Sequence, residues 1–284
     1  MNAGRWSRRE LLCGLAAGAA AALAPVAAGA QDAPALERIR ARGSLRVALY
    51  QAFPPFHVDG RGIDAALARA LAEALQLKYE PLPFQAGESL GDDLRNAVWK
   101  GHYLGWGPAD VLLHVPVEPP LMRENPQVRI LAPYYRERVR LAYDTRQFPQ
   151  GVSSLGELRG HRVAVAGQSL AGWLLAGAEQ GALREQLSTH WPDGAAAAQR
   201  LKAGEMEAVA GLGSELESVL HDDPRVAIEP LPTPRAPRDG WAVGCAVKKD
   251  AADLALALQQ AMASLQGSGR LQAMFREAGV RWQL

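Results

Sequence analysis

Strand-like and helix-like segments alternate along this chain from residue 33 onward. Short apolar runs rich in β-branched residues predict strands over residues 45–50, 78–84 and 109–115. Between the first two, residues 63–77 repeat apolar side chains on one face at helical spacing. Residues 89–100 are expected to form the next helix. Strands and helices that alternate in this order predict an open α/β sheet whose strands are mostly parallel.

A second cycle of the same kind follows, from a strand at 139–145 to one at 225–231. One strand at 240–249 and the helices after residue 251 are then left over. Short crossings near residues 136–140 and 234–240 would return these elements to the first unit. We therefore expect an α/β protein with two lobes, each an open mostly parallel sheet with flanking helices. The expected division is lobe 1 at 31–137, lobe 2 at 138–238, and a return to lobe 1 at 239–284.

The first thirty residues have the pattern of an export signal. Arginines precede an apolar Ala/Gly/Leu run, and Ala28-Gly29-Ala30 resembles a cleavage site. The pair Arg8-Arg9 indicates a twin-arginine signal, with ordinary Sec export as the alternative. Residues 1–30 are therefore expected to be a signal peptide, and the mature protein to be periplasmic. No later stretch has the roughly 18 apolar residues that a membrane span needs.

Charge and cysteine content exclude several classes of partner. Removal of residues 1–30 takes away three arginines and one glutamate, which changes the formal net charge from +1 to −1. A nucleic-acid partner would require a basic patch, so none is expected. Cys245 would be the only cysteine of the mature chain, and the histidines show no metal-ligand spacing. We expect a monomer without metal or cofactor.

Several segments together resemble the family 3 periplasmic solute-binding proteins, the two-lobed receptors that usually serve amino-acid ABC importers. These segments are ALERIRARGSLRVALYQAFPPF, GIDAALARALAEAL, LAPYYRERVRLAYD, LGELRGHRVAVAGQSLAGWLL, LKAGEMEAVAG and AVGCAVKKDAADLALALQQAMASLQGSGRLQAMFREAG. The resemblance implies a small-molecule ligand held in a hinged cleft and an ABC permease as partner. The segment LRNAVWKGHYLGWGPADVLLHVPVEPP is similar to a subgroup associated with quinoprotein (PQQ) dehydrogenases.

The charges that hold an amino acid in this family are displaced or missing. An arginine twelve residues after the aspartate that matches Asp110 would grip the α-carboxylate, but that position is Met122, and Arg123 follows it. One residue on a helix is a rotation of about 100°, although an adjusted loop would restore the grip. The acid that pairs the ammonium would stand at Leu212. A standard α-amino acid is therefore not the expected ligand.

Other residues are candidates for lining the cleft, because loops at the carboxyl ends of parallel strands form the ligand sites of open sheets. We expect an aromatic, neutral or acidic small ligand. The alternative is that these residues only pack the edge of the lobe, and for His114 that it is structural. The candidates are Tyr50, Phe53, Phe56, His114, Val117, Arg123 and the turn Gly167, Gln168 and Ser169, whose N–H groups would hold an anion.

The segment HYLGWGPA is longer than the resemblance implies. Because it precedes the strand at 109–115, we expect it at the amino ends of the strands, away from the ligand. Tyr103 and Trp106 would then either support the sheet or dock a partner.

Three functions remain open. The first is a non-enzymatic binding protein that delivers or signals a small ligand. The second is an accessory protein of a periplasmic PQQ-dependent alcohol dehydrogenase system, with the dehydrogenase or a cytochrome c as partner. The third is an enzyme similar to the cyclohexadienyl dehydratase built on the same scaffold, for which His114 is the candidate acid or base.

Overall fold

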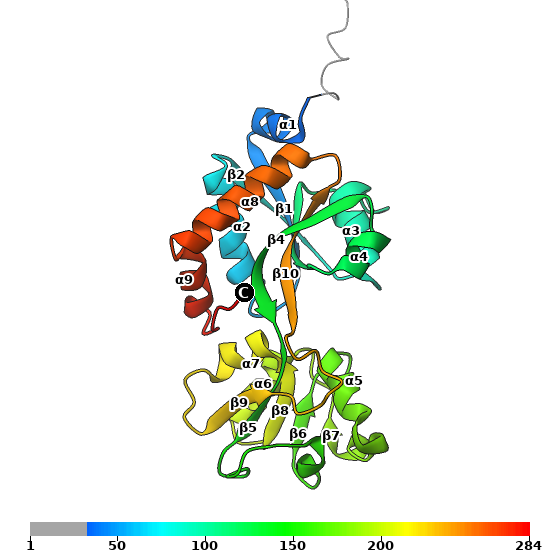
Figure 1. Cartoon of the computed structure of the whole chain (residues 1–284), viewed down its shortest axis with the longest axis vertical. Helices are drawn as coiled ribbons and strands as arrows, with labels where there is room; N and C mark the ends of the chain where they lie inside the picture. The colour runs from blue at the N-terminus through cyan, green and yellow to red at the C-terminus, as the bar shows by residue number, and fades with distance from the viewer. Residues whose placement is uncertain (1–32) are drawn as a thin grey trace, which may run out of the picture.

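A computed structural model describes residues 33–284, which form two five-stranded sheets with helices on both faces (Figure 1). The predicted signal peptide and its twin-arginine motif lie outside the described residues. The sheet order is β2-β1-β3-β10-β4 in one lobe and β7-β6-β8-β5-β9 in the other. Each sheet is mixed, because its fourth strand runs antiparallel to both neighbours. The predicted two-lobed α/β architecture is confirmed.

Lobe 1 contains the first sheet and the C-terminal helices. Its strands are β1 (Ser44–Tyr50), β2 (Lys78–Phe84), β3 (Val111–Pro116), β4 (Val128–Glu137) and β10 (Trp241–Lys248). One face packs against α1 (Ala35–Arg42), α2 (Ile63–Ala74), α8 (Ala252–Gly267) and α9 (Arg270–Glu277). The other face packs against α3 (Leu90–Leu94), its π-helical continuation Arg95–Trp99, and α4 (Pro119–Glu124).

Lobe 2 repeats the arrangement with shorter elements. Its strands are β5 (Val139–Asp144), β6 (Val163–Val165), β7 (Leu187–Ser188), β8 (Ala208–Leu212) and β9 (Val226–Pro230). Its longer helices are α5 (Leu170–Ala176), α6 (Gly194–Lys202) and α7 (Gly213–Leu220). Short 3-10 turns follow at Leu155–Leu158, Ala178–Gly181 and Arg184–Gln186. Alpha5 covers one face of the sheet, and α6 and α7 cover the other.

The strand β4 and the short helix α4 were not expected from the sequence. Beta4 contains Pro133 and lies at the edge of its sheet, where a missing N–H is tolerated. Alpha4 begins with Pro119 and Pro120, and proline is compatible with the first turn of a helix. The prolines that suggested a loop therefore start a helix of six residues.

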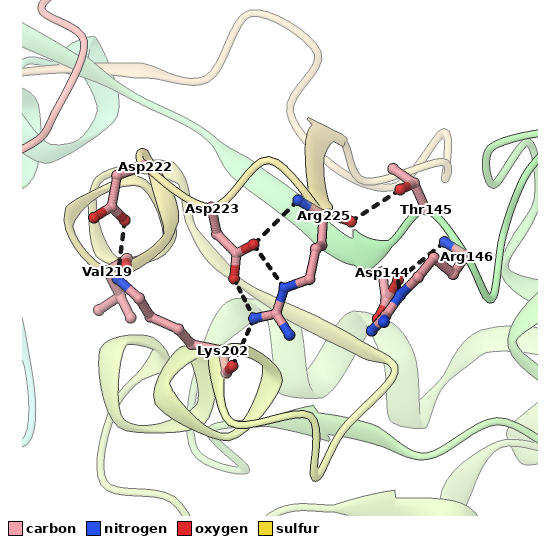
Figure 2. Close-up of polar contacts among 8 residues, drawn as sticks. All are labelled: Asp144, Thr145, Arg146, Lys202, Val219, Asp222, Asp223 and Arg225. Carbon is pink, nitrogen blue, oxygen red and sulfur yellow. Dashed lines mark hydrogen bonds and ion pairs between the residues drawn. The ribbon is translucent and has the colours of Figure 1, made fainter.

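The side of lobe 2 where α6 and α7 end and β9 begins is held by a group of paired charges (Figure 2). Arg225 donates from Nε and Nη2 to the carboxylate of Asp223, at 2.9 and 2.6 Å, and from Nη2 to the carbonyl oxygen of Lys202 at 2.8 Å. Lys202 Nζ in turn donates to the carbonyl oxygen of Val219 at 2.9 Å and to Asp222 at 2.9 Å. These bonds join the ends of α6 and α7 to the start of β9. The pairs satisfy one another, so this group is structural.

Candidate functional site

The carboxyl edges of the two sheets meet where the chain crosses between the lobes. Beta4 runs in the same direction as β3, because both are antiparallel to β10, so Glu137 lies at the carboxyl edge of the first sheet. Beta5 then begins at Val139, directly opposite Leu212, the last residue of β8. The carboxyl edges of open α/β sheets are where ligands bind. This junction is therefore the candidate site.

Three of the predicted residues form one aromatic cluster on lobe 1. The ring of Phe53 stacks on that of Phe56 at 5.4 Å between centroids, and His114 lies 4.7 Å from Phe53 and 4.1 Å from Phe56. Phe56 is completely buried, whereas Phe53 is half-buried. Within this cluster, Phe53 is the ring that remains partly accessible to a ligand.

His114 is turned into the core of lobe 1, where only 8% of it is exposed. Its Nδ1 lies 3.3 Å from Oδ2 of Asp64, and its backbone N–H donates to the hydroxyl of Tyr134 at 3.1 Å. The same hydroxyl donates to Oδ1 of Asp64 at 2.7 Å. Burial, followed by the charge of Asp64, raises the pKa of Tyr134 well above its ordinary value, so the phenol stays protonated and donates. This network holds His114 in a fixed orientation.

Tyr50, at the end of β1, is also held by a polar contact. Its hydroxyl donates to Oδ2 of Asp93 at 3.0 Å, and Oδ1 of Asp93 accepts from the N–H of Gly87. Burial raises the pKa of Asp93, and burial together with Asp93 raises the pKa of Tyr50. The ring of Tyr50, 4.8 Å from that of Phe84, is thus fixed at the lobe edge.

Arg123 and Val117 differ in how far they are exposed. Arg123 is exposed in the last turn of α4, whereas Met122 packs against the core formed with α3. Val117 is half-buried against the same core. Because the helix continues through Met122 and Arg123, the two side chains leave it about 100° apart. The guanidinium therefore stands at the surface of α4.

The turn Gly167-Gln168-Ser169 in lobe 2 is largely occupied by its own hydrogen bonds. The N–H groups of Gly167 and Ser169 donate to the carbonyl oxygens of Thr189 and Ala166, each at 3.1 Å. The hydroxyl of Ser169 accepts from the N–H of Gly172 at 3.1 Å, which caps α5. Of the three N–H groups of the turn, those of Gly167 and Ser169 are thus bonded, whereas among the described residues no such bond is made by that of Gln168. Gln168 is exposed.

Leu212 is followed by a carboxylate that the sequence analysis missed. Glu215, in the first turn of α7, accepts a hydrogen bond from the N–H of Leu212 at 3.1 Å and is 7% exposed. Burial raises the pKa of Glu215 to about 7. Spacing could have revealed it, because an acid three residues after a helix start often bonds back to that start. The carboxylate therefore bonds to the start of α7 and, through the N–H of Gly194, to the start of α6.

We expect the Glu215→Gln variant to lose much of the pH dependence of stability that the wild type shows near neutrality. A pKa of about 7 in the folded protein, against 4.5 ordinarily, means that the folded state binds more protons between these values. The free energy of unfolding therefore falls as pH rises through this window, by roughly 3 kcal/mol for one such group. Urea unfolding between pH 4.5 and 8 measures it.

The free energy of unfolding of the Glu215→Gln variant should still depend on pH to some extent. Burial also raises the pKa of Glu137, which together with Asp193 raises the pKa of Glu215. Equal slopes in the variant and the wild type would contradict the assignment to Glu215. Exposed Glu205→Gln serves as the control and should retain the wild-type slope.

The segment with Tyr103 and Trp106 does not stay at the amino ends of the strands as expected. The ring of Trp106 stacks 5.5 Å from that of Phe84, the last residue of β2, and 4.6 Å from His102. The segment therefore folds back along the sheet, because Trp106 finds apolar contacts there. Tyr103 and Leu104 stay 88% and 71% exposed. Trp106 supports the lobe, and Tyr103 stands at the surface.

Within residues 33–284, no three His, Cys, Asp or Glu side chains are grouped as a metal site requires. No helix in this range is both long and apolar enough to cross a membrane. Cys245 is buried in β10, and burial raises the pKa of its thiol to about 12. It is therefore an unreactive core residue at neutral pH.

Comparison with known proteins gives a likeness in structure alone. No protein-family model matches the chain, and no curated protein matches it. An ancestral cationic amino acid solute-binding protein has a TM-score of 0.65 at 18% identity, over 85% of this chain and 98% of that one. An amino acid ABC transporter substrate-binding protein from Streptococcus pneumoniae, bound to L-arginine, has a TM-score of 0.60 at 20% identity, over 89% and 100%.

An ancestral amino-acid-binding protein described as a precursor of cyclohexadienyl dehydratase has a TM-score of 0.56 at 19% identity, over 86% and 99%. At such identities the likeness shows the fold and not the ligand. The chain has the two-lobed fold of periplasmic binding proteins.

Proposed function

We propose that this protein is an exported periplasmic solute-binding protein whose lobes close on a small ligand that is not a standard α-amino acid. The fold supports capture between two lobes, since hinge closure around a ligand is how such molecules work. The solved structures that it resembles include amino-acid-binding proteins of ABC transporters. An ABC permease is the partner that this function implies.

One observation carries the exclusion of amino acids. Where the family resemblance requires an acid for the ligand ammonium, this chain has Leu212, and the nearby carboxylate of Glu215 is buried against its own helix. Burying an ammonium without a partner costs several kcal/mol. On the other side, Arg123 points away from the core that Met122 contacts. We infer from these two positions that the cleft lacks the charge pair that a zwitterion needs.

The accessible groups at the junction favour an aromatic or otherwise apolar ligand. Tyr50, Phe53 and Val117 offer partly exposed apolar surface on lobe 1. On lobe 2, α5 presents Trp173 and Leu170, which are 74% and 45% exposed. Exposed large apolar side chains often mark interaction surfaces, and we infer that these contribute to the ligand cleft.

The experiment is a thermal-shift screen, because a ligand that binds only the folded state raises the melting temperature. The panel contains the common L-amino acids, aromatic and aliphatic carboxylates, alcohols and PQQ, tested on the wild type and on Arg123→Ala. We expect shifts below about 1 °C for amino acids, and a shift of several degrees for an aromatic neutral or acidic compound. An amino acid that stabilises the wild type but not Arg123→Ala would overturn the proposal.

A second candidate is an accessory role with a periplasmic PQQ-dependent alcohol dehydrogenase or its cytochrome c. The observation that favours it is the exposure of Tyr103 and Leu104, since tyrosine is a common anchor of interfaces. Pull-down of the dehydrogenase by the wild type but not by Tyr103→Ser would support it. The enzymatic alternative has less support, because His114 is engaged with Asp64 and Tyr134 in the core.

A further inference from the structure

A cavity of about 510 Å³ lies beside the two crossings between the lobes, on the lobe 2 side. It is formed by the start of β5, by Ser153, and by the chain that leads from β9 back toward β10. None of the residues predicted to bind the ligand lines it. Its volume falls in the range of small-molecule sites.

The wall of the cavity is mostly apolar and poor in hydrogen-bond donors. Prolines at positions 230, 232, 234 and 237 contribute rings without N–H groups, and Val139, Leu231 and Ala236 add further apolar surface. Proline also limits the conformations of the loop, so the cavity is largely preformed. A ligand that fits here needs an apolar body.

Two arginines contribute to the lining of the cavity. Arg138 and Arg238 both line the cavity, and among the residues that the structure describes no Asp or Glu does so. Arg138 Nη1 donates to Oε1 of Gln283 at 2.7 Å, but its Nε is buried without an acceptor. Arg238 is exposed. Arginine is the side chain best suited to hold a carboxylate.

Three acids lie near these arginines, namely Glu137, Glu157 and the exposed Asp239, and none of them lines the cavity. Glu137, which precedes Arg138, is completely buried and accepts hydrogen bonds from Ser214 and from the N–H of Arg138, so it does not face the cavity. Ser153 donates to Glu157, whose carboxylate lies behind this lining residue and not on the wall. The cavity therefore combines a positive rim with an apolar wall.

We propose that this cavity binds a small organic anion, whose carboxylate pairs with Arg138 and Arg238 and whose apolar body lies against the prolines. Arg138 belongs to the first crossing and Arg238 to the second. A ligand held by both ties the two crossings together and restrains the movement of the lobes. This site is separate from the interlobe ligand of the proposed function and does not depend on it.

The probe is benzoate, with benzyl alcohol as its neutral analogue and inorganic phosphate as an anion without an apolar body. Isothermal titration calorimetry is done on the wild type, Arg238→Ala and the control Arg235→Ala. Arg235 is an exposed arginine of the same loop that does not line the cavity. We expect benzoate to bind the wild type and Arg235→Ala equally, and Arg238→Ala about tenfold more weakly, as the loss of one charge-assisted contact implies.

Benzyl alcohol and phosphate should each bind at least about tenfold more weakly than benzoate. Equal benzoate affinity in Arg238→Ala and the wild type, or no benzoate binding at 10-fold molar excess over about 1 mM protein, overturns the site. Phosphate that binds as tightly as benzoate overturns the role of the apolar wall. These outcomes are distinct from failure of the proposed function, which the Arg123→Ala thermal shifts report.

Discussion

Replacement of Asp64 with alanine should lower the free energy of unfolding by about 3–5 kcal/mol, the cost of breaking a buried charged network. Asp64 is 2% exposed in the first turn of α2 and accepts from the Tyr134 hydroxyl at 2.7 Å, with His114 Nδ1 at 3.3 Å. Alanine would remove the carboxylate from both partners and leave the Tyr134 hydroxyl with only the longer 3.4 Å contact to Nδ1 of His114 among its side-chain partners. The change would therefore weaken the packing of α2, β3 and β4 at one point.

Two further variants make this expectation specific. Asp64→Asn retains a carbonyl oxygen for Tyr134 and should lose less than half as much stability. Glu73→Ala, on the same helix, removes only an ion pair with Arg270 whose side chains are 68% and 50% exposed. Exposed pairs contribute about 0–1 kcal/mol. Urea unfolding at pH 7 compares the three variants, and equal losses for Asp64→Ala and Glu73→Ala would contradict the network.

The two-lobed architecture was predictable because strand and helix signals are local. Most strands are short apolar runs, and the crossings follow from the count of elements left over after two cycles. The strand β4 was not predicted because its buried and exposed residues do not alternate. Leu131 and Ala132 are both buried, and Ala132 has a left-handed φ of 51°. The register of β10 shifts beside it. Such an irregularity depends on the neighbouring strand and leaves no local pattern.

The sequence predicted which residues gather at the candidate site, but not how their side chains are oriented. The sequence predicted that Phe53, Phe56 and His114 lie together, and the structure groups them. The orientation of His114 depends on Asp64 and Tyr134, which are far from it in sequence. Asp64 follows Ile63 in an apolar helix and precedes Leu67, Ala68 and Leu71, all buried. That spacing was the available signal that an acid lies on the buried face.

The junction between the lobes is held by contacts that only the assembled chain creates. The N–H of Arg281 donates to Oε2 of Glu217 at 2.8 Å, and Oε1 of Glu217 accepts from Arg140 at 2.9 Å. Ser214 donates through N–H and hydroxyl to Glu137. The C-terminal tail thus joins lobe 1 to α7 of lobe 2. Movement of the lobes must rearrange these bonds or pivot around them.

The second large effect is expected at the crossing itself, where Gly240→Ala should destabilise the protein by at least about 3 kcal/mol. Gly240 has a left-handed φ of 63°, and a Cβ there would lie 1.8 Å from the carbonyl oxygen of Glu137 and 2.6 Å from Cγ of Arg138. The backbone of the first crossing therefore occupies the space that a side chain would need. Alanine must force the two crossings apart.

Gly204→Ala is the matched control for this clash. Gly204 has a similar φ of 78°, but nothing lies within 4 Å of its Cβ position, so only the conformational cost of about 1–2 kcal/mol applies. We expect the melting temperature to fall much further in Gly240→Ala than in Gly204→Ala, or Gly240→Ala to be recovered only in insoluble form while the control is soluble. Melting temperatures within about 2 °C of each other, a difference worth less than about 1 kcal/mol in a protein of this size, would show that the crossings are not in the close contact described. Such a result would also weaken the proposal that one anion contacts both Arg138 and Arg238.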